Sequence, residues 1–190
     1  MAKLIFLSGS VRKDSLNKKL FMQAYEFAKE LGTDAKLIDL NNYEMPFYDG
    51  DLEAASGLPE NVKKLKKEFV ECDGFFIANP EYNSSFSPLL KNALDWISRP
   101  SEKGEAGLIA YKGKVAALSA ASPGGFGGLR GLVPLRMMFS NIGVHVLPDQ
   151  VAIPQAHNAF DKNGKFKDEK TASMVKGLVK SLNEVAGKLM

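Results

Sequence analysis

The chain has 190 residues, of which 45% are hydrophobic and 25% charged, and its formal net charge is +3. This length and composition predict one soluble domain, spanning residues 1–190, with a substantial hydrophobic core. The small net charge argues against a dedicated nucleic-acid binder, and no run of Lys and Arg reaches the length of a basic arm.

Cysteine content and hydropathy point to a cytoplasmic protein. The single cysteine, Cys72, excludes an intrachain disulfide and fits a reducing compartment. No stretch of about 18 apolar residues could span a bilayer, and the first residues do not resemble a cleavable leader. We therefore expect no membrane span.

Apolar segments alternate along the chain with amphipathic ones. The short apolar runs predict strands at residues 3–8, 35–40, 74–78, 114–120 and 145–153. Apolar residues at helical spacing predict helices at residues 16–31, from 59 to about 70, at 88–98, at 129–141 and near the C-terminus. The segment 41–57 is predicted to be a long irregular loop.

Five strands alternating with five helices predict an α/β fold. Each parallel connection needs a crossover, usually a helix, so the sheet should be parallel and covered on both faces. Pro148 predicts that the last strand lies at an edge, because proline cannot donate to a central ladder. Ligands of such sheets bind beyond the carboxyl ends of the strands.

The loop after the first strand carries groups that suit a phosphate. It reads GSVRKDSLN, and Ser10, Arg12, Ser15 and Asn17 lie before the helix or in its first turn. A helix N-terminus attracts anions, serine hydroxyls donate to phosphate oxygens, and arginine can bind two of them. Simple capping by Ser15, with Arg12 in solvent, explains the same residues equally well. The spacing matches neither G-x-x-x-x-G-K-[ST] nor G-x-G-x-x-G.

The loop after the third strand suits the edge of a planar heterocycle. It reads NPEYNSS: Pro80 turns the chain, Tyr82 offers a ring and a hydroxyl, and Asn83 and Ser84 add small polar groups. An Asx or serine turn that caps the following helix is the alternative interpretation.

The loop after the fourth strand, SPGGFGGLRG, has glycine at four of the five positions 124–128. Glycine allows the backbone to approach a ligand closely. By itself this signal is weak.

Other patterns predict no chemistry. Ser15 and Lys18 match S-x-x-K without its companion motifs. His145 and His157 have no ligand-type neighbours at metal-binding spacing, so we predict no metal site. No nucleophile, base and orienting group can be assembled, so no catalytic side chain is predicted.

Together, GSVRKDSLN, NPEYNSSFSPLLKNALDW and SPGGFGGLR resemble the motifs of the NADPH-dependent FMN reductase family, from residue 3 to about residue 155. The resemblance implies a flavodoxin-like sandwich with strand order 2-1-3-4-5. It also implies bound FMN, and NADPH or NADH as the hydride donor.

The resemblance carries residue roles with it. The FMN phosphate is expected on the first loop, the ribityl chain and ring on the second, and the opposite ring edge on the third. The expected cofactor-binding residues are Ser10, Arg12, Ser15, Asn17, Pro80, Glu81, Tyr82, Asn83, Ser84, Ser122 and Gly124.

The implied activity is hydride transfer from the nicotinamide through FMN to a quinone, flavin, azo compound or similar small acceptor. The family also implies a homodimer or homotetramer, with the 41–57 segment near the subunit boundary. A flavodoxin-type electron carrier and a regulatory FMN-binding protein without turnover are the alternatives. The net charge of +3 argues against the carrier, because flavodoxins have strongly acidic surfaces.

Overall fold

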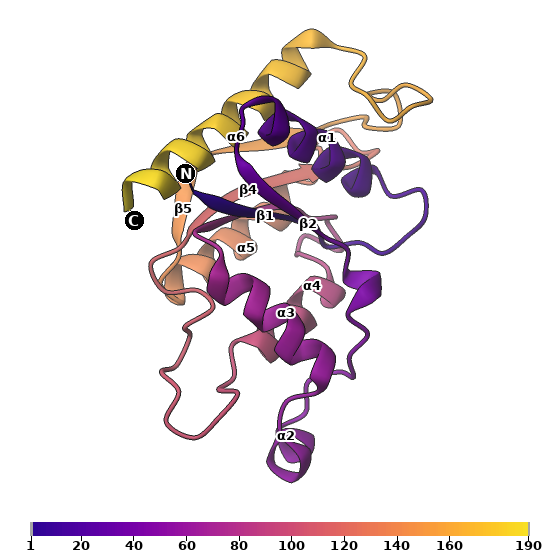
Figure 1. Cartoon of the computed structure of the whole chain (residues 1–190). Helices are drawn as coiled ribbons and strands as arrows, with labels where there is room; N and C mark the ends of the chain where they lie inside the picture. Colours follow the sequence, from indigo (N-terminus) through magenta and orange to yellow (C-terminus); the bar gives the residue numbers. More distant parts are fainter. Residues whose placement is uncertain (1, 190) are drawn as a thin grey trace.

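A computed structural model describes residues 2–189 and contains one parallel five-stranded sheet (Figure 1). The strand order is β2-β1-β3-β4-β5, as predicted. The strands are β1 (Lys3–Ser8), β2 (Asp34–Ile38), β3 (Gly74–Ala78), β4 (Val115–Ala121) and β5 (His145–Ile153).

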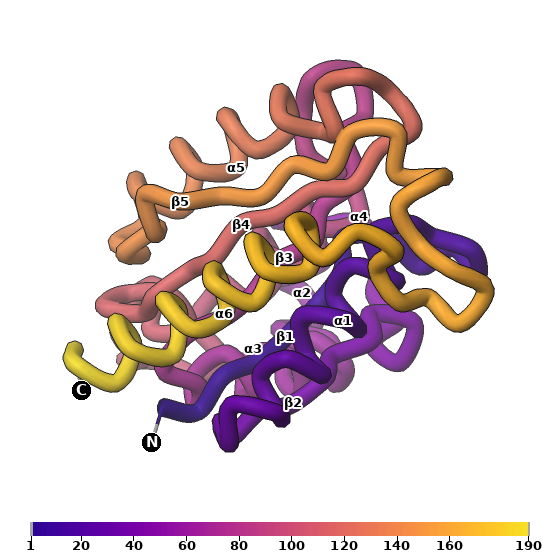
Figure 2. The backbone as a smooth tube through the Cα atoms, turned by 90° about the horizontal axis from the view of Figure 1, so that it is seen from above, coloured from indigo at the N-terminus to yellow at the C-terminus, as the bar shows by residue number. Residues whose placement is uncertain are grey.

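Helices cover both faces of this sheet (Figure 2). Helices α1 and α6 lie on one face, and α3, α4 and α5 lie on the other. The helices are α1 (Leu16–Glu30), α2 (Gly50–Ser56), α3 (Glu60–Glu71), α4 (Pro88–Ile97), α5 (Leu129–Asn141) and α6 (Glu169–Leu189). The predicted fold class is confirmed.

The apolar character of the strands follows from their place in the sheet. All residues of β3 and β4 are buried, because helices cover both faces of these central strands. Phe6 and Phe76 stack at 5.6 Å under α1, and Phe75 meets Phe139 of α5 at 5.1 Å on the other face. Strand β2 alternates in burial, as expected at an edge.

The prediction that residues 41–57 are irregular is wrong in part. A 3-10 turn (Leu40–Asn42) and helix α2 lie in this segment. The Asp49 side chain caps α2 by accepting from the N–H groups of Asp51 and Leu52. No residue of α2 is buried, so the helix has no apolar stripe to reveal it in the sequence.

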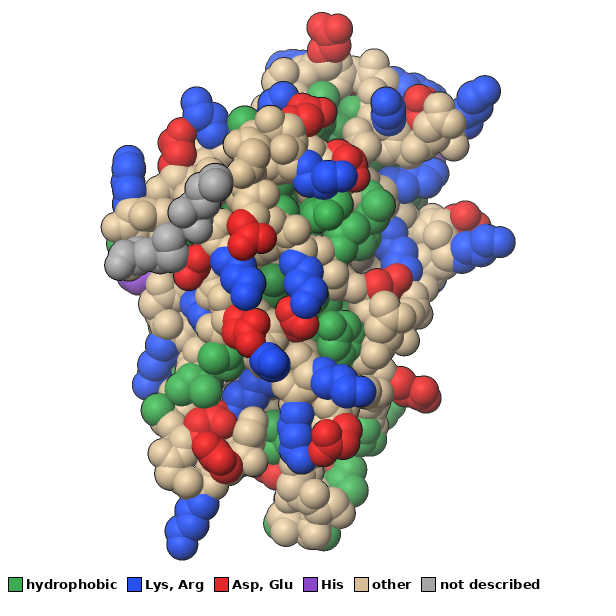
Figure 3. Space-filling view, viewed as in Figure 1, with side chains coloured by type: hydrophobic (Ala, Val, Ile, Leu, Met, Phe, Trp, Pro, Cys, Tyr) green, Lys and Arg blue, Asp and Glu red, His purple; other side chains and the backbone are tan. Residues whose placement is uncertain are grey.

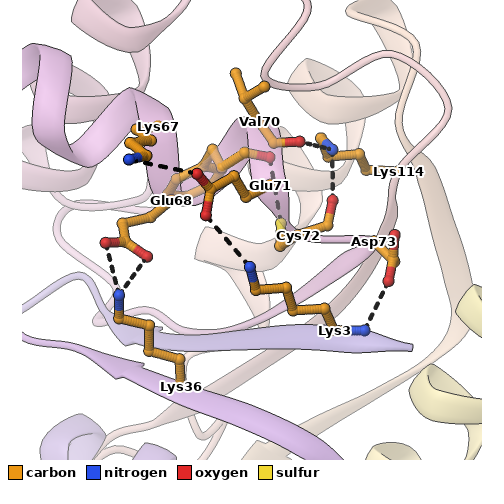
Figure 4. Close-up of polar contacts among 10 residues, drawn as sticks. Lys3, Lys36, Lys67, Glu68, Val70, Glu71, Cys72, Asp73 and Lys114 are labelled. Atoms are coloured by element: carbon orange, nitrogen blue, oxygen red, sulfur yellow. Dashed lines mark hydrogen bonds and ion pairs between the residues drawn. The ribbon is translucent and has the colours of Figure 1, made fainter. Parts of the chain in front are cut away.

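At the amino edge of the sheet, charged side chains pair with one another (Figure 4). Lys36 contacts Glu68 at 2.7 Å, and Lys3 contacts Glu71 at 3.2 Å. Burial raises the pKa of the Cys72 thiol to about 12, so this group stays protonated and unreactive at neutral pH. A hollow of about 160 Å³ lies at this edge, beside Cys72, Lys112 and Lys114.

Across residues 2–189, no helix has the length and apolar character needed to cross a membrane.

Candidate functional site

Three loops meet at the carboxyl edge of the sheet and enclose a pocket of about 120 Å³. Parallel strands place their carboxyl ends along one edge, which brings together polar residues that are distant in sequence. Eight of the eleven predicted site residues line this pocket: Ser10, Arg12, Ser15, Asn17, Pro80, Glu81, Tyr82 and Ser122. Asn83, Ser84 and Gly124 are not among its lining residues.

The first loop presents unused hydrogen-bond donors to the pocket. Ser15 is the N-cap of α1 and accepts from the Lys18 N–H at 3.3 Å, which leaves its own hydroxyl proton free. The first-turn N–H groups of α1 have no intrahelical partner. Ser10 is a buried residue and Arg12 an exposed one, and within residues 2–189 neither the Ser10 hydroxyl nor the Arg12 guanidinium forms a hydrogen bond. These donors suit an anion at the helix N-terminus.

Asn17 has a second task that the sequence did not indicate. Its Nδ2 donates to the Ala121 carbonyl at 2.9 Å, and its Oδ1 accepts from the Ala121 N–H at 2.9 Å. The buried amide therefore ties the first turn of α1 to the end of β4. It fixes the distance between the first and third loops.

A buried polar network joins the first and second loops. Ser87, the N-cap of α4, donates from Oγ to the Gly9 carbonyl at 2.6 Å. The Asn79 side chain accepts from the Ser87 N–H at 3.2 Å. A Cβ on Gly9 would lie 2.6 Å from Asn79 Oδ1, so only glycine fits there. Sequence reasoning missed Asn79 and Ser87, although Ser87 followed by Pro88 is a typical helix start.

The second loop ends in a tight turn. Tyr82 and Ser85 exchange two backbone hydrogen bonds at 2.9 and 3.1 Å. Asn83 and Ser84 between them have φ values of 52° and 65°, the geometry of a type I′ turn. The turn holds the Tyr82 ring at the pocket rim, where the residue is 46% exposed. Asn83 and Ser84 shape this turn.

An ion pair connects the second loop to α5. Arg130 contacts Glu81 at 2.8 Å, and its guanidinium lies 5.2 Å from the Phe126 ring centre. Helix α5 approaches closely because Gly131 has no side chain: a Cβ there would lie 2.9 Å from the Ser85 carbonyl. Arg130 stood in the quoted third motif, but nothing in the sequence indicated its partner.

The third loop is held mainly by backbone contacts. The Ser122 hydroxyl accepts from the Gly124 N–H at 3.2 Å, and the Gly124 carbonyl accepts from the Gln155 N–H at 3.2 Å. Gly127, with φ of 62°, lies against the backbone of Ile153 and Pro154. The glycines therefore serve close packing against the end of β5.

The chemistry of the pocket is that of a binding site. It offers hydroxyls, backbone N–H groups and one guanidinium, all suited to phosphate. In residues 2–189 there is no cluster of three His, Cys, Asp or Glu residues that could hold a metal ion. The pocket is smaller than the roughly 300–1,000 Å³ of sites that enclose a small molecule.

Comparison with known proteins identifies the family. The sequence model of the NADPH-dependent FMN reductase family matches residues 2–158. The chain belongs to this family. It is therefore an oxidoreductase that works with FMN and NAD(P)H.

Similar proteins cover nearly the whole chain. An NAD(P)H-dependent FMN reductase of Pseudomonas aeruginosa is 34% identical over 181 residues, which are 95% of this chain and 92% of the relative. An NAD(P)H:quinone oxidoreductase of Solanum tuberosum is 33% identical over 192 residues, covering 98% and 94%.

Solved structures agree with this assignment. The flavoenzyme NAD(P)H:(acceptor) oxidoreductase of Paracoccus denitrificans superposes with a TM-score of 0.83 at 32% identity, covering 99% of this chain and 98% of the other. An archaeal flavodoxin has a TM-score of 0.61 at 11% identity, over 97% and 99% of the two chains. The second likeness concerns the fold alone.

Proposed function

We propose that this family member holds FMN with its phosphate on the first loop. The supporting observation is the convergence of the Ser10 and Ser15 hydroxyls, the Arg12 guanidinium and the N-terminus of α1 on one pocket. These donors have few partners of their own, and a phosphate needs several donors at once. Asn17 acts as a positioning residue that holds this turn against β4.

The flavin ring is proposed to lie over the pocket rim, between the second and third loops. Pro80, Tyr82 and Ser122 line this side of the pocket. The exposed ring of Tyr82 offers an aromatic surface beside the flavin. Glu81 is paired with Arg130 and orders the loop. Asn83, Ser84 and Gly124 contribute by shaping their turns.

The proposed reaction moves a hydride from NAD(P)H to a quinone or a similar small acceptor. Bound FMN supplies the redox chemistry, and the protein supplies binding and orientation. An open rim admits nicotinamide and acceptor in turn. Several relatives are named quinone reductases or quinone oxidoreductases, which supports a quinone as acceptor.

Rapid mixing tests this proposal. Protein loaded with FMN and mixed anaerobically with NADPH should lose its yellow absorbance without any partner protein, and added quinone should restore the colour. A flavodoxin-type carrier would need a partner reductase before bleaching. An FMN-binding regulator would keep its yellow absorbance both with NADPH alone and with NADPH plus a partner reductase. Protein that fails to bind FMN would contradict the proposal altogether.

We also propose that the chain forms one domain, works in the cytoplasm and self-associates. A lone buried cysteine supports the reducing compartment. Phe47, in the segment between β2 and α2, is 82% exposed and borders an apolar hollow formed with Met45, Pro88 and Leu89. Such a projecting aromatic residue suits a contact between subunits.

A further inference from the structure

A second, larger groove lies beside the phosphate pocket. It runs between α1 and the segment that follows β5, and its volume is about 380 Å³. This volume falls in the range typical of small-molecule sites, roughly 300–1,000 Å³. Ser15 lines both the groove and the phosphate pocket, so the two are contiguous.

Packing holds the two walls of the groove together. Phe27 of α1 stacks on Phe166 with ring centres 6.5 Å apart, and Figures 1 and 2 show the segment after β5 alongside the start of α1. The Asp161 carboxylate accepts from the N–H groups of Asn163 and Lys165 at 2.8 and 2.9 Å. These bonds fix the turn that forms the outer wall.

The groove is strongly basic. Lys13, Lys18, Lys19 and Lys165 line it. Lys18 contacts Asp39 at 3.1 Å, whereas within residues 2–189 the other three form no ion pair. The one acidic lining residue, Glu26, is itself paired with Lys29 at 3.6 Å. Figure 3 shows Lys and Arg side chains along this side of the molecule. The charges predict an anionic ligand.

The remaining lining residues suit a nucleotide base. Met22 is 41% exposed and offers a polarisable apolar surface for a flat ring. The side-chain amides of Gln23 and Asn163 can donate to and accept from base edges. Inorganic phosphate would use only the lysines, and a nucleic acid or membrane would need a basic surface wider than this groove.

We propose that this groove binds the 2′-phosphorylated adenosine half of NADPH. The inference rests on the proposed function, because it takes the nicotinamide to lie over the flavin ring and the adenosine half to reach the groove that adjoins the phosphate pocket at Ser15. Lys13, Lys19 and Lys165 would neutralise the 2′-phosphate, which NADH lacks. The groove therefore makes the enzyme selective for NADPH.

The double variant Lys19→Gln/Lys165→Gln tests this assignment. The KM for NADPH should rise by at least about tenfold, because charge-assisted contacts to the phosphate are lost. The KM for NADH, the kcat with either donor and the FMN affinity should not change. The control variant Lys64→Gln/Lys103→Gln removes the same charge from exposed positions outside the groove and should leave both KM values unchanged.

Direct binding separates this inference from the proposed function. Adenosine 2′,5′-bisphosphate should bind the wild-type protein more tightly than 5′-AMP, and the groove variant should lose this preference. Equal affinities, or KM values for NADPH and NADH that rise together, would overturn the inference. Failure of the proposed function would appear separately, as absent FMN binding or absent bleaching by both nicotinamides.

Discussion

At the residue scale, Asn17 shows how a side chain in the pocket lining can also hold two elements together. Both ends of its amide bond to the backbone of Ala121, 104 positions away in the sequence. The sequence placed Asn17 correctly at the pocket, because polar residues after a buried strand gather at one sheet edge. The backbone partner could not be predicted, since no local pattern encodes it.

Replacing Asn17 with alanine should destabilise the protein even without FMN. The N–H and C=O of the buried Ala121 would lose their partners, which costs about 2 kcal/mol or more in the free energy of unfolding. Urea denaturation of the apoprotein measures this loss. Asn158→Ala, at an exposed position, is the control and should change stability by less than about 0.5 kcal/mol. Equal stability of the two variants would rule out the positioning role.

At the element scale, the site depends on how closely α5 approaches the second loop. Gly131 lies against Ser85 and Glu81. A Cβ on Gly128 would lie only 2.7 Å from the Cβ of Ala120, so this position also needs glycine. The polar strand ends predicted the pocket, and the helical spacing predicted most helices. Helix α2 was missed because it buries no residue, and the glycine contacts were missed because they join distant elements.

The variant Gly131→Ala tests this approach. Alanine favours a helix by about 1 kcal/mol over glycine, but the clash with the Ser85 carbonyl should outweigh this gain and lower stability by about 1–3 kcal/mol. FMN affinity should fall as well, because Glu81 would move. Thermal unfolding and flavin titration measure the two effects.

Gly177→Ala in α6 is the matched control. A Cβ there would meet nothing within 4 Å, so only the helix preference remains, and stability should rise by about 0.5–1 kcal/mol. If Gly131→Ala also stabilises the protein, the close contact between α5 and the second loop is not present in solution.

At the scale of the whole molecule, the two edges of the sheet differ in kind. The amino edge pairs its charges internally, and the carboxyl edge leaves hydroxyls, lysines and one arginine free for anions. The phosphate pocket and the basic groove proposed above therefore lie on the same side of the molecule. The apolar hollow around Phe47 shares no lining residue with the phosphate pocket or the basic groove and suits the proposed contact between subunits.

Phe47→Ser should weaken self-association. We expect the wild-type protein to sediment as a dimer or tetramer, and the variant to shift toward the monomer, because an interface loses its exposed aromatic residue. Met174→Ser is the control: it replaces a half-exposed residue of α6 and should not change the sedimentation behaviour. A monomeric wild-type protein would contradict the proposed assembly.

The placement of the FMN phosphate on the first loop is the central claim, and a comparison of FMN with riboflavin in the wild-type protein and Arg12→Ala tests it most directly. Flavin fluorescence titration should show that Arg12→Ala weakens FMN binding by roughly 1.5–3 kcal/mol, about 10- to 160-fold, since one charge-assisted contact is lost. Riboflavin, which has no phosphate, should bind both proteins equally. An unchanged FMN affinity, or an equal loss for both flavins, would contradict the account.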